Sequence, residues 1–567
     1  MSKLNNEQVK TESRGLRGPL SEDLASSDAF LSEAGKLLIK FHGSYEQTNR
    51  DKRGAASKEY IFMVRSKLPG GQLTAPQYLA HDDIATRYGN GTLRITTRQG
   101  IQFHGVVKGH LRDTIRGLNH ALVTTFGACG DVVRNVICCP ALSDDSRRQQ
   151  VQRIAGLISQ ATLPRSRAYH QIWVDGEPVV ADEEDPLYGQ AYLPRKFKAA
   201  IAFAGDNCMD IFTNDAGLIA LFDEDGSLAG FNVVAGGGMG LTHNKQDTFA
   251  RLADIIGFVE PDQAVDVIKA IVTVHRDFGD RTNRKHARLK YVLEEWGVDK
   301  FREELQARVP FPIRPARAMP KFDVLDHLGW HAQGPGTWSL GLPIDSGRIA
   351  DAGEVRLRTA IRTIVERFGT RVQLTAQQNL LLSDIRDDDR ATVTALLREH
   401  GVVTVEDISG VRRNSLACPA LPTCGLAISE AERVLPKVLG IFEQALAEAG
   451  LPDEPIVFRM TGCPNGCARP YVAEVALVGR SMDKYVLYLG GDVAGTRIAR
   501  QFQDLLPLGQ LGATLRPLFE RFRDERTAGE AFGDYCDRVG FDYLHGLVAA
   551  SAPVPPAAAV RPAQPVG

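Results

Sequence analysis

Four cysteines late in the sequence form two close pairs. Cys418 and Cys424 enclose five residues, and Cys463 and Cys467 enclose three. Four thiolates from two such loops can hold a [4Fe–4S] cluster. Prolines stiffen both loops, and the Asn-Gly step inside the second pair tolerates the left-handed backbone of a tight turn. The pattern therefore predicts an iron–sulfur site.

Two other interpretations of these cysteines stay open at this level. A structural zinc site usually has ligand pairs separated by two to four residues, so the five-residue spacer fits zinc poorly. The four thiols could also be buried without any ligand. Spacing and flanking residues together favour the cluster.

The elements that must position these loops occur twice in the chain. Residues 94–101 (RITTRQGI) are similar to 373–380 (QLTAQQNL), and residues 134–141 (RNVICCPA) are similar to 413–420 (RNSLACPA). The offset between the two strings is the same in both pairs, since 373 − 94 equals 413 − 134. Chance recurrence of common elements is the alternative, but a shared offset favours an internal duplication. A duplicated chain with a pseudo-twofold axis can hold a large cofactor between its halves.

Hydrophobic periodicity gives the same order of elements in both halves: strand, helix, strand, strand, helix. In the first half the elements are expected at residues 59–68, 75–88, 93–97, 101–106 and 110–126. In the second half they are expected at 338–343, 352–368, 371–375, 379–383 and 389–400. Each half is followed by a larger α/β segment, at about 130–320 and 409–550. We expect an α+β protein.

Composition excludes several classes of protein. The 567 residues are too many for one core, so about two to four domains are expected. The formal net charge of −2 gives no sign of a nucleic-acid partner. No apolar run is long enough to predict a membrane span, and the stretch from Met1 to Leu20 does not read as a secretory signal. Nine cysteines, an odd number, indicate reduced thiols in the cytoplasm.

Five strings resemble the sulfite/nitrite reductase hemoprotein family. They are residues 97–104 (TRQGIQFH), 192–198 (YLPRKFK), 281–288 (RTNRKHAR), 414–424 (NSLACPALPTC) and 461–467 (TGCPNGC). The resemblance runs in order from about residue 37 to about residue 540, and it is greatest to the assimilatory sulfite reductases. It implies an enzyme that reduces sulfite to sulfide with six electrons, in sulfate assimilation and cysteine biosynthesis. It also implies two cofactors, a siroheme and a [4Fe–4S] cluster, with Cys467 linking the cluster to the siroheme iron.

The resemblance assigns roles to the basic residues of the first half. It implies a substrate-binding, catalytic group made of Arg65, Arg134, Lys196 and Lys198. It implies siroheme contacts from Arg94, Arg98, His104, Arg195, Arg288 and Asn465. A siroheme with eight carboxylates and a sulfite dianion both need such cations and donors. Any one of these side chains, taken alone, is most often a solvated surface charge.

Two pairs of these basic residues have a spacing that places them together. Arg94 and Arg98 share one face if 93–97 is a strand, and Lys196 and Lys198 share one face if 195–200 is a strand. A polar sheet face would show the same spacing.

The glycines of 230–240 are expected to let the backbone approach siroheme closely. They do not form the G-x-G-x-x-G pattern of a dinucleotide site.

The resemblance further implies a fold of two ferredoxin-like halves that form one domain, with two larger α/β domains around the cofactors. We expect an N-terminal extension at 1–36, half domains at 37–128 and 323–408, and large domains at 129–322 and 409–550. Residues 551–567 (SAPVPPAAAVRPAQPVG) are expected to be a disordered tail.

Two rival functions remain: a nitrite reductase on the same scaffold, and an electron-transfer protein without chemistry of its own. The converging cations of an anion pocket argue against the second. No flavin or nicotinamide motif is found, so the electrons should come from a partner, either a NADPH flavoprotein subunit or ferredoxin. The strings 42–50 (HGSYEQTNR) and 126–131 (FGACGD) resemble ferredoxin-dependent members. In some members a thioether joins the residues that match Tyr45 and Cys129, although two unlinked side chains are expected more often.

Overall fold

The computed structural model describes residues 5–52, 58–140, 146–166, 173–174, 177–178 and 184–551. The tail expected at 551–567 lies outside the described residues, apart from residue 551 at the end of the last helix. Within the described residues, no helix is both long and apolar enough to cross a membrane.

Two small five-stranded sheets form the half domains. The first has the order β1-β2-β5-β4-β15 and the second β13-β14-β19-β18-β3. The strands and helices of the first half are β1 (Ser44–Thr48), β2 (Tyr60–Arg65), α4 (Ala75–Tyr88), β4 (Leu93–Ile95), β5 (Ile101–Val106) and α5 (Leu111–His120). Those of the second are β13 (Gly329–Gly334), β14 (Thr337–Leu342), α9 (Leu357–Phe368), β18 (Arg371–Leu374), β19 (Leu380–Arg386) and α10 (Arg390–Glu399).

The two halves exchange their edge strands. β3 (Gln72–Leu73) pairs with β18 of the second half, and β15 (Arg348–Ile349) pairs with β4 of the first. Each short strand follows a glycine turn with positive φ that lies against the other half. A Cβ added to Gly71 would lie 2.6 Å from the Leu374 carbonyl oxygen, and one added to Gly347 would lie 2.3 Å from that of Ile95. Only glycine fits there, and the exchange joins the halves into one domain.

The two larger domains repeat one topology. Their sheets have the orders β6-β9-β10-β11-β12 and β20-β21-β22-β23-β24. In both sheets the first three strands are parallel and the last two are added antiparallel. The strands are β6 (Ile137–Cys138), β9 (Ala199–Phe203), β10 (Ala216–Phe222), β11 (Leu228–Ala235), β12 (Asp254–Val259), β20 (Ser415–Ala417), β21 (Phe458–Thr461), β22 (Val475–Ser481), β23 (Lys484–Leu489) and β24 (Arg500–Pro507).

Helices cover these sheets on the outside of the molecule. In the first large domain they are α6 (Ser146–Ala161), α7 (Ala264–Phe278) and α8 (Leu289–Gln306). In the second they are α11 (Gly410–Arg413), α12 (Leu435–Glu448), α13 (Leu511–Glu525), α14 (Phe532–Val539) and α15 (Phe541–Ser551). The N-terminal extension forms α1 (Asn6–Thr11), α2 (Leu20–Ala25) and α3 (Glu33–Leu38). Short strand pairs also lie outside the main sheets: β7 (Trp173–Val174) with β8 (Glu177–Pro178), and β16 (Asp351–Ala352) with β17 (Val355–Arg356).

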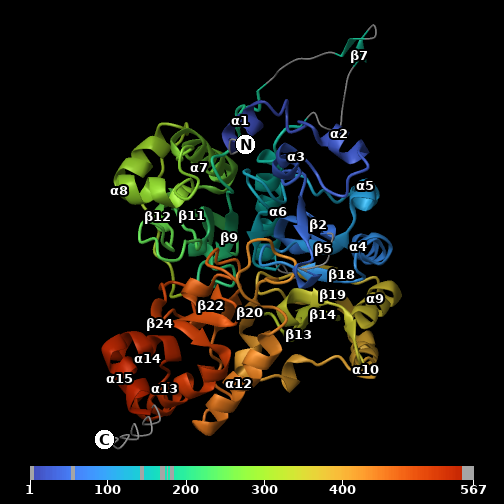
Figure 1. The fold of residues 1–567 in the computed structure, drawn as a ribbon. Coiled ribbons are helices and arrows are strands. Elements are labelled where there is room, and N and C mark those ends of the chain that lie inside the picture. The colour runs from blue at the N-terminus through green and yellow to red at the C-terminus, as the bar shows by residue number, and fades with distance from the viewer. Residues whose placement is uncertain are drawn as a thin grey trace, which may run out of the picture.

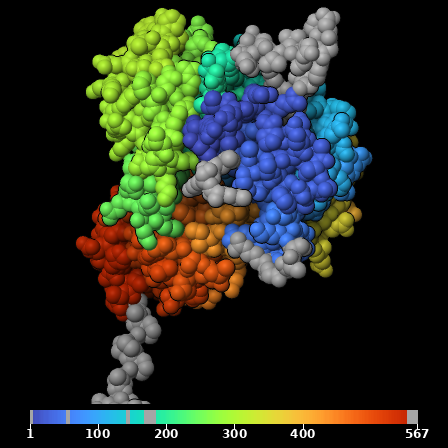
Figure 2. Space-filling view, turned by 45° about the horizontal axis from the view of Figure 1, so that its top comes forward, coloured from blue at the N-terminus to red at the C-terminus, as the bar shows by residue number. Residues whose placement is uncertain are grey.

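The four parts meet in the middle of the molecule. Figure 1 shows the half domains on one side (blue and yellow) and the large domains on the other (green and red). On the face in Figure 2 the blue surface of the first half domain borders the orange surface of the second large domain. The predicted α+β fold with an internal duplication is confirmed. The predicted domain boundaries stay proposals.

Several expected elements differ in length from those observed. The helix expected at 110–126 ends at His120, because Leu122 adopts a φ of 58°. The helix expected at 352–368 begins at Leu357, after the β16–β17 hairpin. The strand expected at 93–97 is shorter, since β4 ends at Ile95, and the condition of a strand at 195–200 is not met, since β9 begins at Ala199. Arg98, Lys196 and Lys198 therefore lie in loops, and the shared strand faces predicted for them do not exist.

Candidate functional site

The four cysteines of the two pairs converge at one end of the second large sheet. Cys418 follows β20, and Cys463 and Cys467 lie between β21 and a short 3-10 helix at Pro470–Val472. Burial raises the pKa of Cys418 well above its usual value, and the neighbouring Cys467, Cys463 and Cys424 raise it further. The pKa of Cys463 is raised to about 12 by burial and then by Cys467. A bound metal reverses this preference, because a coordinating thiol is deprotonated.

Backbone and amide donors already face two of the sulfurs. The Gly462 N–H donates to Cys418 Sγ at 3.3 Å, and the Asn465 side-chain amide donates to Cys463 Sγ at 3.4 Å. Donors of this kind stabilise thiolates that ligate a cluster. Cys467 is the exposed member of the four. The residues present thus fit a [4Fe–4S] cluster.

The first half domain holds these cysteine loops from the opposite side. Arg50 Nη1 donates to the carbonyl oxygens of Cys424, at 3.2 Å, and Ala427, at 2.6 Å. Thr97 Oγ1 donates to the Cys467 carbonyl at 3.1 Å. Residues far apart along the chain therefore meet at the cluster loops.

Arg94 belongs to this support and does not face an open pocket. Its Nε is 2.7 Å from Glu432 Oε2, its Nη2 donates to the Ala417 carbonyl at 2.9 Å, and its Nη1 lies 3.5 Å from Gln102 Oε1. Arg348 Nε binds the other oxygen of Glu432 at 2.7 Å. All three guanidinium nitrogens of Arg94 have protein acceptors. The siroheme contact that the resemblance implies for Arg94 stays a prediction.

The four predicted substrate ligands do come together. The pKa of Lys196 is lowered to about 7, first by burial and then by Arg195, Arg134 and Arg288, whereas Cys467 acts in the opposite direction. The pKa of Lys198 is lowered well below its usual value by burial and then by Lys196. Cys467 acts in the opposite direction on Lys198 too, because its charge raises the pKa of that lysine. The cations of the first large domain therefore lie within electrostatic range of the exposed cysteine of the second.

Arg65 and Arg134 border the same region through Tyr45 and Cys129. Arg65 Nη1 donates to Cys129 Sγ at 3.3 Å. Arg134 Nη2 lies 3.4 Å from the Tyr45 hydroxyl and 3.2 Å from the Gly130 carbonyl. Tyr45 and Cys129 influence each other electrostatically, and the pKa of Tyr45 is raised, chiefly by burial. The thioether between them stays a prediction, which an intact mass lower by two hydrogen atoms would confirm.

Two residues that sequence reasoning missed hold this basic group in place. Asp215 accepts from Arg288 Nε at 2.9 Å and Nη2 at 2.8 Å, and its Oδ2 accepts from the Lys198 N–H at 2.8 Å. Asn214 Oδ1 accepts from Arg98 Nη1 at 2.8 Å. No sequence signal marks these two residues, since their partners are far away along the chain.

Asp131 does the same for Arg195. Arg195 Nη1 is 3.9 Å from Asp131 Oδ1, and Arg284 Nη2 is 2.9 Å from Oδ2. Burial, followed by the positive charges of Arg284, Arg134 and Arg288, lowers the pKa of Arg195 to about 10, although Asp131 acts in the opposite direction. The predicted siroheme contacts thus include two arginines, Arg195 and Arg288, whose charge is partly offset by a carboxylate.

Orphaned polar atoms mark the space beside these cations. Both ring nitrogens of His104 are buried and have no hydrogen-bond partner among the described residues. The same holds for the Nε atoms of Arg65 and Arg98. The pKa of His104 lies well below its usual value because of burial and then Arg348, Arg94 and Arg65. Buried donors without acceptors are costly. This set fits a cofactor that carries several carboxylates.

The glycine-rich segment packs against the protein itself. A Cβ added to Gly237 would lie 2.1 Å from the Phe212 carbonyl oxygen, and one added to Gly238 would lie 3.1 Å from Arg288 Nη2. Lys290, another residue missed in the sequence, donates to the Gly240 carbonyl at 2.7 Å. Protein contacts thus account for the glycines at 237 and 238, and the close approach to siroheme predicted for 230–240 stays a prediction.

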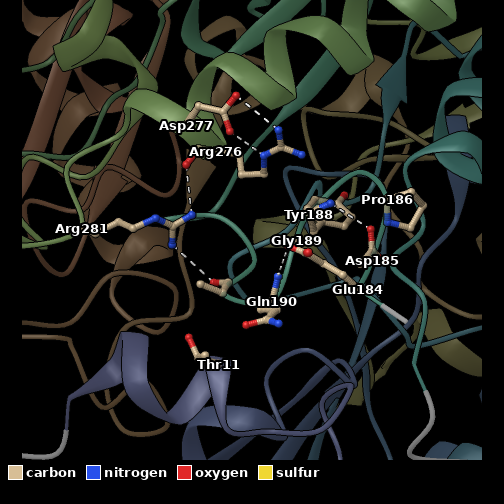
Figure 3. Close-up of a pocket in the computed structure, with 11 residues that line it drawn as sticks. Thr11, Glu184, Asp185, Pro186, Tyr188, Gly189, Gln190, Arg276, Asp277 and Arg281 are labelled. Atoms are coloured by element: carbon tan, nitrogen blue, oxygen red, sulfur yellow. Dashed lines mark hydrogen bonds and ion pairs between the residues drawn. The ribbon is translucent and has the colours of Figure 1, made fainter. Parts of the chain in front are cut away.

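A pocket of about 590 Å³ lies beside α1, and none of the predicted site residues lines it. Figure 3 shows Arg281 on one side of this pocket and Glu184 and Asp185 on the other. Its Nη2 donates to the Tyr192 carbonyl at 2.7 Å, and buried Lys10 donates to the Leu193 carbonyl, also at 2.7 Å. Both contacts hold the start of the segment that carries Lys196 and Lys198. The pocket region supports the site and is not the site.

Comparisons with known proteins agree with this architecture. Residues 154–313 match the family model described as nitrite and sulphite reductase 4Fe-4S domain. Residues 53–121 and 331–400 each match the nitrite/sulfite reductase ferredoxin-like half domain. The 4Fe-4S match covers the first large domain, whereas the paired cysteines lie in the second, its repeat.

Relatives match over nearly the whole chain. "Sulfite reductase [ferredoxin]" of Synechococcus elongatus is 48% identical over 559 residues, covering 95% of this chain and 90% of the relative. "Sulfite reductase [NADPH] hemoprotein beta-component" of Myxococcus xanthus is 47% identical over 540 residues, covering 94% and 96%. The solved structure of the Mycobacterium tuberculosis NirA protein matches with a TM-score of 0.78 and 25% identity, covering 95% and 97%. The chain belongs to the nitrite and sulfite reductase family.

Proposed function

We propose that this chain is the catalytic hemoprotein of an assimilatory sulfite reductase, which reduces sulfite to sulfide with six electrons. The observation that carries the proposal is the meeting of two unlike groups. Lys196 and Lys198 of the first large domain lie within electrostatic range of Cys467, the exposed thiol of the second. An anion site beside a cluster ligand is what a reductase of a small oxyanion requires.

The cofactors fit the residues in two adjacent sets. Cys418, Cys424, Cys463 and Cys467 would hold the [4Fe–4S] cluster, with Cys467 shared with siroheme. The cofactors supply the stored electrons and the open iron position for the reduction. The carboxylates of siroheme would be met by the predicted set: Arg94, Arg98, His104, Arg195, Arg288 and Asn465. Arg94 would in addition support the cysteine loops through Glu432 and the Ala417 carbonyl.

The basic residues divide into two chemical roles. Arg65 and Arg134 present the planar N–H donors of a guanidinium group, which suit a small oxyanion, so they would hold the anion. Lys196, whose pKa is lowered to about 7, can give a proton from Nζ to an oxygen that leaves as water and take one back from solvent. Lys198 adds a fourth donor. These roles follow the four predicted catalytic residues without change.

The electrons would come from a partner protein. The two relatives are named for different donors, ferredoxin and NADPH, and their identities of 48% and 47% do not decide between them. The strings at 42–50 and 126–131 favour ferredoxin. None of the nine cysteines forms a disulfide in the structure, which is typical of the reducing cytoplasm, where we place the enzyme.

Three measurements on the purified holoenzyme test the proposal. The ultraviolet–visible spectrum should show siroheme bands, and metal analysis should find about five iron atoms per chain, one from siroheme and four from the cluster. Sulfite should be reduced with a reduced artificial donor, and NADPH alone should not support the reaction. One iron or fewer per chain, or sulfite reduction with NADPH alone, would contradict it. Comparing reduced ferredoxin with a NADPH flavoprotein then identifies the donor.

A further inference from the structure

The first large domain carries cysteines at two of the positions where the second carries cluster ligands. Cys139 follows β6 as Cys418 follows β20, in the pair of similar strings at 134–141 and 413–420. Because β10 and β22 are equivalent strands of the two copies, Cys208 occupies the position in the first copy that Cys467 occupies in the second. Each of these two cysteines lies two residues before a residue with positive φ, Asp210 at 46° and Arg469 at 55°, and each such residue opens a 3-10 helix.

The strand register supports this equivalence independently. β6 pairs with β9 through Ile137 and Ala200, and β20 pairs with β21 through Leu416 and Arg459. Ile137 and Leu416 each stand two residues before their cysteine, Cys139 or Cys418. Ala200 and Arg459 each stand eight residues before theirs, Cys208 or Cys467, so the register gives the same equivalence. The repeat therefore brings Cys139 and Cys208 to one place for the same reason that it brings Cys418 and Cys467 together.

Two further ligand-type side chains complete this place. Cys139 Sγ lies 3.2 Å from Asp206 Oδ2 and 3.3 Å from His327 Nε2. One ligand atom from each of Cys139, Asp206, Cys208 and His327 lies within 4.8 Å of the other three. All four residues are buried, with exposed fractions of 0%, 7%, 1% and 7% respectively. No member of the group belongs to the anion pocket or to the paired cysteines.

The surroundings orient each ligand. Asp206 Oδ1 accepts from the backbone N–H groups of Cys208, at 3.0 Å, and Leu325, at 3.3 Å, which leaves Oδ2 for the centre. His327 adopts a φ of 58°, which non-glycine residues rarely do. Arg148 Nη1 donates to Cys139 Sγ at 2.6 Å. Outer partners of this kind hold the ligands of metal sites and offset their charge.

We propose that Cys139, Cys208, His327 and Asp206 bind one structural zinc ion. Two thiolates, an imidazole and a carboxylate form a donor set that zinc binds in tetrahedral geometry, with bonds of about 2.0–2.3 Å. The edges of such a tetrahedron measure roughly 3.3–3.8 Å, close to the 3.2 and 3.3 Å observed from Cys139. The four ligand atoms are too close together to enclose a four-iron cube. Two thiolates and one carboxylate exceed the charge of Zn²⁺ by one, and Arg148 offsets that charge.

The ion would fasten the linker between the first large domain and the second half domain. His327 lies just before β13, and the same linker joins the Asp206 loop through the Asn207 N–H, which donates to the Asp323 carbonyl at 2.8 Å. That loop continues to Asn214 and Asp215, which hold Arg98, Arg288 and Lys198. The zinc site would therefore stabilise the loop whose residues position the cations of the anion pocket, without contacting substrate.

Zinc analysis of the holoenzyme tests the proposal. Protein purified from medium with added zinc should contain about one zinc per chain that resists dialysis against a chelator. X-ray absorption at the zinc edge, which iron does not disturb, should show two sulfur and two nitrogen or oxygen neighbours. A zinc shell of four sulfurs would place the metal at the paired cysteines and overturn the proposal. So would zinc-free protein, including one in which Cys139 and Cys208 form a disulfide.

Variants assign the zinc to these residues. Cys208→Ser combined with His327→Ala should lower the zinc content roughly tenfold or more, whereas iron content should stay within error. Cys536→Ser is the matched control, because Cys536 is equally buried but lies on α14, and it should keep the zinc. Unchanged zinc in the double variant would refute the site. Iron content reports separately on the proposed function, so the two proposals fail independently.

Discussion

The two large domains share one topology but carry different chemistry. The first presents cations to the centre of the molecule, among them Arg134, Lys196 and Lys198, and the second presents Cys467 and the other cluster thiols. Neither copy has both groups, so neither forms the site alone. On the proposed function, the difference shows how a duplication can divide a reaction: one copy would hold the anion, and the other would hold the electron-carrying group.

The contact between the copies uses equivalent residues of opposite charge. Asp210 and Arg469 occupy the same left-handed position before their 3-10 helices, and they form a buried ion pair with each other. Arg459 Nη1 also binds Asp210 Oδ2 at 2.8 Å. An acid in one copy and a base in the other favour pairing of unlike copies. This contact holds the first large domain, which carries the cations (the cation side), against the second, which carries the cluster thiols (the thiol side).

The largest expected effect comes from removing the thiol side. Cys467→Ala should abolish sulfite reduction, because it removes the thiolate proposed to join the cluster and siroheme. Metal analysis and the visible spectrum, recorded beside steady-state rates, will show which cofactor is lost. Cys536→Ala, at a buried thiol far along the chain on α14, should keep normal iron content and rate. Full activity in Cys467→Ala would mean that the second large domain does not contribute the linking thiolate.

Breaking the contact between the copies should have the next largest effect. Asp210→Asn leaves the buried guanidinium groups of Arg469 and Arg459 without their carboxylate. Removing one partner of a buried ion pair typically costs about 3–5 kcal/mol. Thermal or denaturant unfolding of the holoenzyme should register this loss. Asp504→Asn, at an exposed ion pair with Arg480, is the control and should change stability by less than about 1 kcal/mol.

Much of this comparison was readable in the sequence, but its contacts were not. The constant offset between the similar strings and the periodicity predicted the element order of both half domains, and α4 begins and ends where the pattern placed it. The exchanged strands β3 and β15 are two residues long, too short for any periodicity. The shared face considered for Lys196 and Lys198 required a strand over 195–200, but the chain becomes a strand only at Ala199.

The site was predicted as a set of residues and not as a geometry. The cysteine spacing and the family strings identified both groups, yet Arg94 faces Glu432, far away along the chain. Asp215, which holds Arg288 and Lys198, has no local pattern either. Cys139 and Cys208 were counted as ordinary reduced thiols, because the offset between the copies is shorter for the second equivalent pair (208 and 467) than for the first (139 and 418). Long-range pairing of this kind follows from the fold.

Lys198 sharpens the comparison on the cation side. Burial and the charges of Lys196, Arg98 and Arg288 hold the pKa of Lys198 well below its usual value. A dianion offsets this repulsion more than a monoanion does, so Lys198 should favour sulfite over nitrite. Lys198→Asn should lower kcat/KM for sulfite about ten- to a hundredfold, the equivalent of roughly 1–3 kcal/mol, and spare nitrite. Equal losses for both anions would mean that Lys198 does not set the preference.

The smallest expected effect concerns the charge of Lys196, whose pKa is lowered from 10.5 to about 7 by burial and by neighbouring cations. Nitrite keeps one negative charge across neutral pH, so it reports the protonation of the protein alone. A bound anion favours the charged lysine and raises its pKa, so binding takes up a proton once the pH exceeds the pKa of the free protein. The KM for nitrite should therefore be flat at low pH and then rise up to about tenfold per pH unit. The bend should lie at or above pH 7, because carboxylates of a bound cofactor raise the pKa of the lysine further. Lys196→Arg is the matched variant, since a guanidinium stays protonated throughout this range, and its KM should not bend. A bend that persists unchanged in Lys196→Arg would assign the proton to another group and leave Lys196 as a fixed charge of the anion site.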